Sequence, residues 1–367
     1  MLQGPIPFRI AETPVFISKS LQTKMLEVTD VIVDFLTRPD FNARTERFIP
    51  ASMQMPGETN HPQMLVVDYA IVETETGNHE PRLIELQGFP SLHGFQFELD
   101  KYWKQTSDWP ETVDSYLNGY SPNDYLETLK SILIGKEQSE HVVLLDLFPD
   151  QQKTRLDFIC TKNLLGIEPV CLTALKANGS TLYYERSGRK IPIRRIFNRL
   201  VPDELIQHPN LKYIDLKSEY DVTWINHPHH FYRISKCLLP ILKHPFIPEC
   251  HYLAEFNRSQ ALDEWVLKPL FSFAGQGVSM QVTSDQLDAI KDPENWIMQR
   301  KVNYADAIAT PEGPAKTEVR LFLVWKPEWE RPVAMHNLAR LSKGDMIGTQ
   351  YNKDKSWVGG SIAFFER

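Results

Sequence analysis

The sequence predicts an α+β protein with a central region of mixed αβ type. Three features carry this prediction: an early pair of strand patterns joined by a polar turn, a middle stretch that alternates strand and helix patterns, and a final third whose strands look mostly antiparallel. The chain has 367 residues, of which 42% are hydrophobic. Because a single core rarely serves so long a chain, we expect two or three packed units.

The N-terminal part is expected to form a helix, a β-hairpin and a helical stretch. Apolar residues recur at three- and four-residue spacing over 20–36, which indicates an amphipathic helix. Residues 64–73 and 81–89 have strand patterns, and the glycine and asparagine of 75–80 favour a turn between them. The residues of 95–135 then have a helical pattern.

The middle of the chain has the alternating rhythm of a βαβ unit. Residues 141–149 form a continuous apolar run, as in strands that are buried on both faces of a sheet. A helix pattern over 155–166 and a strand pattern over 169–175 follow. We expect a small hairpin that turns at 187–188, and a further strand that ends at Arg199.

The last third is expected to combine one helix with several strands. The helix pattern covers 233–244. Strand patterns follow around Trp265 and Trp296, and then over 318–325, 332–342 and 362–367. No internal repeat or low-complexity segment interrupts this order.

Charge and cysteine content exclude several classes of protein. The net charge is −7, and lysines and arginines are scattered, so the chain carries no electrostatic footprint of a nucleic-acid partner. The 4 cysteines lie far apart without a CxxC pair, which signals neither a zinc site nor a disulfide framework. Without an export leader or a membrane-length apolar run, we expect a cytoplasmic protein with no membrane partner.

Residues 264–279, EWVLKPLFSFAGQGVS, combine a buried strand pattern, a lysine and a glycine loop. Gly275, Gln276 and Gly277 would let backbone N–H groups approach a ligand closely, which suits a phosphate chain. Lys268 lies where the strand would deliver a cation toward that loop. The loop has neither the spacing of a P-loop nor the third glycine of a dinucleotide fingerprint, and an ordinary hairpin loop is the alternative.

Two acids and an amide on predicted strands suit a magnesium ion. Glu85 and Gln87 are two residues apart on one strand, so their side chains leave the same face, and Glu318 lies on another strand. Mg²⁺ prefers such oxygen ligands and is usually shared with nucleotide phosphates. The alternative for Glu85 is the polar face of an edge strand.

Three arginines lie within or beside strand-like apolar runs, namely Arg199, Arg320 and Arg340. An unpaired guanidinium would be costly in such surroundings, so each needs an anion. That anion is either a carboxylate of the protein, in a structural salt bridge, or one of a ligand.

The histidine-rich stretch 225–233, INHPHHFYR, invites a metal-site interpretation. Pro228 interrupts the run, and no cysteine or acid accompanies it, so we expect a solvated loop that enters a helix. Neither a GxSxG elbow nor an HExxH motif occurs in the chain, which removes the commonest hydrolase classes.

Taken in order, these motifs resemble the ATP-grasp superfamily, specifically its circularly permuted carbon–nitrogen ligases, the eukaryotic-type glutathione synthetase and the glutathionylspermidine synthetase-like enzymes. VVDYAIV resembles the family's Asp-Tyr strand, LIELQG its metal motif, and VLKP with the glycine loop its phosphate site. IFNRL and NLARLS resemble the family's segments with substrate arginines, and RISKCLLPIL resembles the segment with its first ATP lysine. WIMQRKV resembles the adenine hinge, and KTEVRLF resembles the strand that gives the third metal ligand. The resemblance covers roughly Val66 to the C-terminus.

The resemblance implies a circularly permuted ATP-grasp fold with an inserted αβ substrate region. Its regions would be an N-terminal α/β region with the metal-binding strand at 1–138, a substrate-domain-like region at 139–225 and a nucleotide-binding region at 226–367. It implies ATP and Mg²⁺ as cofactors, with the metal ligands Glu85, Gln87 and Glu318. The implied nucleotide-binding residues are Lys236, Lys268, Gly275, Gln276, Gly277, Gln299, Lys301 and Val302. The residues implied to hold carboxylate or phosphoryl oxygens are Arg199, Arg320 and Arg340.

The implied reaction joins a small-molecule carboxylate to a small-molecule amine through an acyl phosphate, with release of ADP and phosphate. Two other functions stay open: a nucleotide-binding protein without ligase turnover, and a small-molecule phosphotransferase. A homodimer is also left open. The chain departs from the family at Val66, where the synthetase has arginine, at Gln87, where it has asparagine, and at Arg300, where an acid is common. The serine-rich substrate stretch of the synthetase is also not reproduced around Pro90 and Ser91, so we do not expect glutathione itself as the product.

Overall fold

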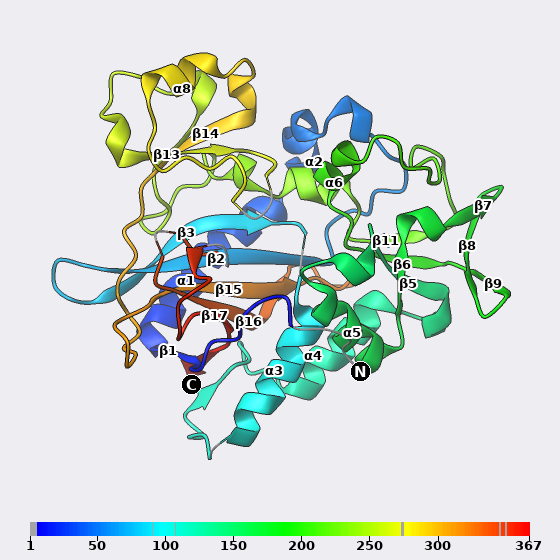
Figure 1. Ribbon diagram of the computed structural model, residues 1–367, viewed down its shortest axis with the longest axis horizontal. Helices are drawn as coiled ribbons and strands as arrows, with labels where there is room; N and C mark the ends of the chain where they lie inside the picture. Colours follow the sequence, from blue (N-terminus) through cyan, green and yellow to red (C-terminus); the bar gives the residue numbers. More distant parts are fainter. Residues whose placement is uncertain (1–5, 90, 107, 273–274, 345, 349–350) are drawn as a thin grey trace.

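The computed structural model describes residues 6–89, 91–106, 108–272, 275–344, 346–348 and 351–367, and shows a mixed structure of helices and several sheets (Figure 1). This agrees with the predicted α+β class. The helices are α1 (Lys19–Leu36), α2 (Phe41–Thr45), α3 (His93–Thr106), α4 (Pro122–Leu133), α5 (Arg155–Leu165), α6 (Pro202–Gln207), α7 (His229–Arg233) and α8 (Ser284–Ala289). None of the helices in these residues has the length and apolar character that a bilayer crossing requires.

The largest sheet is antiparallel, has five strands, and joins distant parts of the chain in the order β17-β16-β15-β2-β3. Its strands are β2 (Met64–Glu73), β3 (His79–Gln87), β15 (Lys316–Val324), β16 (Val333–Ser342) and β17 (Gly359–Ser361). The predicted hairpin of 64–73 and 81–89 is confirmed as β2 and β3. Because β15 pairs with β2, residues about 250 positions apart in the sequence lie on neighbouring strands.

The two faces of this sheet follow from the alternation of side chains along its strands. Leu65 and Val67 of β2 pack in one core with the apolar stripe of α1, whose predicted span 20–36 is confirmed. Met64 and Val66 point to the opposite face and pack in a second core with residues of α3 and α4. Asp68 continues this second face, so its carboxylate lies on the side opposite α1.

A four-stranded parallel sheet, β11-β10-β5-β6, forms the middle of the chain. Its strands are β5 (Val142–Asp146), β6 (Glu168–Cys171), β10 (Arg195–Asn198) and β11 (Thr223–Ile225). The strand predicted within 141–149 is confirmed over Val142–Asp146 as a central, fully buried strand, with α5 as the helix that follows it. A small antiparallel sheet beside it contains β7 (Lys176–Asn178), β8 (Thr181–Arg186) and β9 (Arg189–Pro192), and the predicted turn at Ser187 and Gly188 has positive φ angles of 50° and 74°.

Two further small sheets lie within the described residues. An antiparallel sheet of order β12-β14-β13 packs with α8 as a lobe at the edge of the molecule (Figure 1). Its strands are β12 (Cys250–Tyr252), β13 (Trp265–Pro269) and β14 (Trp296–Arg300). The other sheet joins both ends of the chain through β1 (Val15–Ile17), β18 (Ala363–Glu366) and β4 (Val113–Asp114).

The predicted helix over 233–244 is wrong. Helix α7 ends at Arg233, and only a 3-10 turn at Lys236–Leu238 follows. Two interactions favour this path: the backbone N–H of Gly88 donates to the carbonyl of Ile234 at 2.7 Å, and the hydroxyl of Ser235 accepts from a backbone N–H two residues on. Pro240 adds a position that cannot continue a helix.

The expectation of a solvated loop at 225–233 is also wrong. His227, His229 and His230 are 1%, 4% and 1% exposed, respectively. They are covered by the segment that precedes β2, where the carboxylate of Glu58 contacts His229 and Arg233. Such a partner, more than 160 residues away in the chain, leaves no local signal in the sequence.

Candidate active site

The candidate site is a charged face of the five-stranded sheet. Residues directly opposite each other on neighbouring strands share a face of the sheet, and so do residues two positions apart on one strand. Asp68 lies opposite both Glu85 and Arg320, and Glu318 lies opposite Arg340. The polar side chains on this face include Asp68 of β2, Glu85 and Gln87 of β3, Glu318 and Arg320 of β15, and Arg340 of β16. The topology therefore brings the predicted metal ligands and two of the three predicted arginines to one sheet face.

Asp68 is the buried centre of this face, with an exposure of 0%. Its two carboxylate oxygens accept from Nε and Nη2 of Arg320, both at 2.5 Å, and one also accepts from Nη2 of Arg340 at 3.0 Å. A bidentate pair of this kind fixes both position and orientation of the guanidinium. Arg320 is therefore held rigidly, and its charge is largely met within the protein.

Glu318 contacts a cation and a phenol. Nη2 of Arg340 donates to one carboxylate oxygen, and the hydroxyl of Tyr304 donates to the other at 2.9 Å. Burial raises the pKa of Glu318 above its ordinary value, with Asp68 and Glu85 adding to the rise, although the nearby charge of Arg340 opposes it. A second cation beside this carboxylate would be electrostatically favourable.

Glu85 lies among cations instead. Its carboxylate accepts from the amide nitrogen of Gln87 at 2.5 Å, and it lies 3.9 Å from Nζ of Lys236 and 4.0 Å from Nη2 of Arg320. Burial would raise the pKa of Glu85, but the charges of these cations, together with Lys268 and Arg340, lower it below its ordinary value. Glu85 is therefore ionised at neutral pH.

The two predicted phosphate lysines approach Glu85 from different segments. Nζ of Lys236 donates to the carbonyl of Ser272 at 3.0 Å, and Nζ of Lys268 on β13 donates to the side-chain carbonyl of Gln299 on β14 at 2.5 Å. Burial lowers the pKa of the Lys268 ammonium, which Glu85 opposes and Lys236 reinforces. An anionic ligand between these lysines would stabilise their charged forms.

A cavity of about 890 Å³ opens over the charged face. Its charged lining consists of Arg9, Glu85, Lys153, Arg320, Arg340 and Lys353, and its apolar lining includes Phe8, Phe89, Leu92, Leu338, Ile347 and Val358. Five of those six charged side chains are basic. A site with an apolar wall and convergent cations suits a small organic anion.

Arg199 is not among the residues that line this cavity. Its Nη1 donates to the carboxylate of Asp157 at 2.9 Å, and the pair is 3% and 1% exposed. Its guanidinium also lies 5.2 Å from the ring of Phe158 and 5.6 Å from that of Phe89. The structural salt bridge, one of the two partners left open for this arginine, is thus present, and a role toward substrate stays a prediction.

The remaining predicted nucleotide residues lie on the lobe of β12–β14. Gly275, Gln276 and Gly277 are exposed, and both glycines have positive φ angles, 75° and 72°, as a tight loop requires. Phe273 and Ala274 of the same loop lie outside the described residues. Lys301 and Val302 directly follow β14 and are half-buried.

Sequence reasoning missed several residues of the site. Tyr304, Arg9, Lys153 and Lys353 lie in loops or near the chain ends, and no local pattern distinguishes them from other polar surface residues. Asp68 did leave a signal, because an acid within the apolar run VVDYAIV needs a buried partner.

No protein-family model and no curated protein sequence matches the chain. Among solved structures, the chain is similar to the apo form of a glutathione synthetase-like effector from Globodera pallida. The TM-score is 0.58 at 12% sequence identity, and the match covers 97% of this chain and 90% of the other. Similarity of structure over nearly the full length of both chains shows that this protein has a glutathione synthetase-like fold.

Proposed function

We propose that this protein is an ATP- and Mg²⁺-dependent ligase that joins a carboxylate to an amine. The supporting observation is a set of charges from distant segments, gathered around one sheet face beside a cavity: the carboxylates Asp68, Glu85 and Glu318 and the cations Lys236, Lys268, Arg320 and Arg340. Four positive and three negative charges leave an excess of one positive charge. Such a site favours an anion while still offering carboxylates to a metal ion.

The magnesium site would use Glu85, Gln87 and Glu318. Glu85 is ionised, and Gln87 engages it through the amide nitrogen, so the carbonyl oxygen of Gln87 is the atom that would coordinate. Arg340, which now contacts Glu318, would share or give up that carboxylate. The ion would supply Lewis-acid charge at the phosphate oxygens.

The nucleotide would lie between the five-stranded sheet and the β12–β14 lobe. Lys236 and Lys268 would neutralise its phosphates, since both approach Glu85 and their buried ammonium groups gain from an anion. The glycine loop with Gly275, Gln276 and Gly277 would cover the phosphates, and the base would contact the segment with Gln299, Lys301 and Val302.

Arg340 is the residue best suited to hold the substrate carboxylate. It lines the cavity, its side chain is 32% exposed, and its Nε is buried without a hydrogen-bond partner among the described residues. Arg320 lines the same cavity but is committed to Asp68 through two bonds, so its charge would act on the transferring phosphoryl group from a fixed position.

The reaction would proceed in two balanced steps. An oxygen of the bound carboxylate attacks the γ-phosphorus of ATP as ADP leaves, which forms an acyl phosphate. The amine nitrogen then attacks the acyl carbon and loses a proton, and phosphate leaves with the oxygen that came from the carboxylate. The protein contributes mainly by positioning the reactants and by meeting the charge on the phosphoryl oxygens.

A second function, nucleotide or ligand binding without turnover, is favoured by one specific observation. Arg340 now pairs with Glu318 and Asp68, so the proposed metal ligand is already neutralised by the protein. The structurally similar protein is also described as a glutathione synthetase-like effector. Measurements of turnover separate this function from the first.

The first test is a thermal-shift titration with ATP, with and without Mg²⁺. Binding to the native state raises the melting temperature by mass action. We expect Mg²⁺-dependent stabilisation of the wild type, its loss in Glu318→Gln, and its retention in the control Glu294→Gln, an exposed acid on the β12–β14 lobe. No response of the wild type at millimolar ATP and Mg²⁺ would sink the proposal of a nucleotide site.

The second test screens amino acids, short peptides and polyamines for release of ADP. A ligase requires an acid that stimulates release and an amine that increases it further. With an ¹⁸O-labelled carboxylate, the label passes into phosphate as the amide forms. Phosphate that stays on one small molecule indicates a phosphotransferase, and binding without ADP release indicates the second function.

A further inference from the structure

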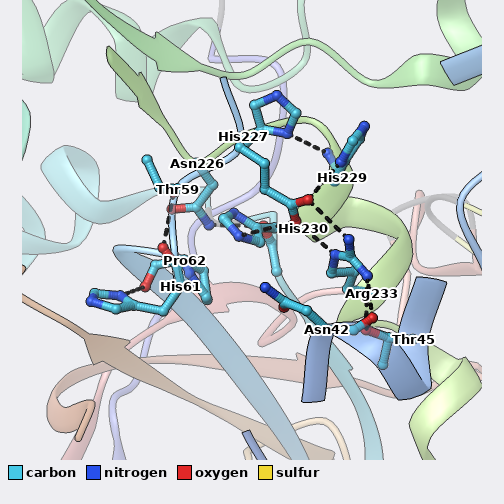
Figure 2. A network of polar contacts seen from close by, with 12 residues as sticks. Asn42, Thr45, Thr59, His61, Pro62, Asn226, His227, His229, His230 and Arg233 are labelled. Atoms are coloured by element: carbon cyan, nitrogen blue, oxygen red, sulfur yellow. Dashed lines mark hydrogen bonds and ion pairs between the residues drawn. The ribbon is translucent and has the colours of Figure 1, made fainter. Parts of the chain in front are cut away.

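A second cluster of ligand-type side chains lies apart from the charged sheet face. It contains Glu58, from the segment before β2, His227, two residues before α7, and His229, the first residue of α7. One possible ligand atom from each of the three lies within 4.8 Å of the others. Figure 2 shows His227, His229, His230 and Arg233 gathered in this network.

The ring nitrogens of both histidines face defined partners. Nδ1 of His229 lies 2.8 Å from Oε2 of Glu58, and its Nε2 lies 3.2 Å from the carbonyl of Met53. Nε2 of His227 lies 3.1 Å from the carbonyl of Pro56. If each Nε2 carries the proton and donates it to its carbonyl, each Nδ1 carries a lone pair, as in histidines that bind metal and are oriented by backbone carbonyls. The lone pair of His227 now accepts from the backbone N–H of His229 at 3.2 Å, and a metal ion would replace that bond.

The structure also contains partners for the other tautomer of His229. The backbone N–H of Met55 can donate to Nε2 of His229 at 3.0 Å, and Nδ1 then donates its proton to Glu58. Because Nδ1 and the carboxylate oxygen are only 2.8 Å apart, a proton lies between them. Metal binding would move the ring proton from Nδ1 to Nε2, at the expense of the bond from Met55.

The fixed charges of the network favour a cation. Arg233 donates to Glu58 at 2.6 and 2.9 Å and to Glu46 at 2.7 Å, so a single guanidinium meets two carboxylates. One negative charge is therefore left for a proton on His229 or for a metal ion to neutralise.

We propose that Glu58, His227 and His229 form a binding site for a single divalent metal ion of the zinc class. Two imidazoles and a carboxylate are ligands typical of zinc, whereas magnesium takes oxygen ligands. Tetrahedral bonds of about 2.0–2.1 Å put ligand atoms about 3.3 Å apart, so small side-chain rotations close the site.

The surroundings supply the rest of a metal site. Glu58 can bind the ion through Oε2, which would give up its bond from Nη2 of Arg233, while Oε1 still accepts from Nε of Arg233 and fixes the carboxylate from outside. His230, whose Nε2 lies 3.9 Å from Oε1 of Glu58, is the nearest protein candidate for a fourth ligand. The ion would join the segment of 53–58 to α7, which directly precedes Lys236.

The test uses full-length protein without a polyhistidine tag, in buffer with Mg²⁺. Apoprotein prepared with a chelator is titrated with zinc sulfate, and bound zinc is measured by elemental analysis after gel filtration. The variants are Glu58→Gln and His229→Gln. The matched control is His251→Gln, because His251 lies 2.9 Å from Glu249 in an exposed pair that has no third ligand within the described part of the chain. Glu318→Gln separates this site from the proposed magnesium site.

We expect one zinc per chain in the wild type, His251→Gln and Glu318→Gln, and at least about tenfold weaker binding in Glu58→Gln and His229→Gln. In case either variant fails to fold, the wild type alone gives a second readout: the chelator lowers its melting temperature, and zinc restores it. The proposal is overturned if the wild type takes up no zinc, or if neither the chelator nor zinc changes its melting temperature. It is also overturned if folded variants bind zinc as tightly as the wild type.

Discussion

Replacement of Arg199 by methionine separates the structural from the catalytic role of this arginine. Methionine keeps an unbranched apolar stem but removes the guanidinium that pairs with Asp157. Because the pair is buried, the variant leaves a carboxylate without its counter-charge. We expect a marked loss of stability, and no direct effect on a ligand in the cavity that Arg199 does not line.

The magnitude follows from the other partners of Asp157. Breaking a buried ion pair costs about 3–5 kcal/mol. Asp157 keeps three backbone donors, the N–H groups of Leu92, Gly94 and Phe95 at 2.9–3.0 Å, which continue to stabilise its charge. The loss for Arg199→Met should therefore be near the lower limit, about 3 kcal/mol. Asp157→Ala should cost about 0.5–2 kcal/mol more, because it also removes the acceptor at the start of α3.

Urea unfolding followed by circular dichroism measures both variants and the double variant. The coupling energy from this cycle should fall within about 0.5–3 kcal/mol, as for residues in direct contact. The reasoning fails if Arg199→Met unfolds at the wild-type urea concentration. A wild-type midpoint combined with a large fall in kcat would instead assign Arg199 to the substrate, as the family resemblance implies.

Three further predictions concern other parts of the chain. Burial raises the pKa of Asp146 from 3.8 to about 8. Its contribution to the free energy of unfolding is therefore complete below about pH 4 and is lost as the pH rises toward 8. Asp146→Asn should reduce the pH dependence of the free energy of unfolding, measured from urea midpoints, by up to about 1.4 kcal/mol per pH unit. A Cβ atom at Gly88 would lie 2.3 Å from the carbonyl oxygen of His230, so Gly88→Ala should cost at least about 1–3 kcal/mol. The control Gly360→Ala, whose Cβ would have no neighbour nearer than 3.9 Å, should stay near wild type, and equal melting temperatures would contradict the packing argument. Lys268→Met should weaken Mg²⁺-ATP binding in a calorimetric titration far more than it lowers the melting temperature, and unchanged affinity would remove this lysine from the proposed nucleotide site.

The sequence by itself determined the elements whose patterns are local. The apolar stripe of α1, the β2–β3 hairpin and the buried strand β5 all follow from spacing and turn residues within a single segment. The same local signal identified Glu85 and Gln87 as neighbours on one strand face. These features depend only on residues that are adjacent in the chain, so a single sequence contains them.

Only the tertiary structure decided which of these elements meet. The pairing of β15 with β2 sets Asp68 against Arg320, 252 positions apart, and no residue near either one specifies that register. Other contacts between distant segments pair Arg199 with Asp157 and bury His229 against Glu58. The physical reason is that the charge and burial of a side chain depend on what the fold packs against it, whereas the sequence pattern reports only which face of its own helix or strand it occupies.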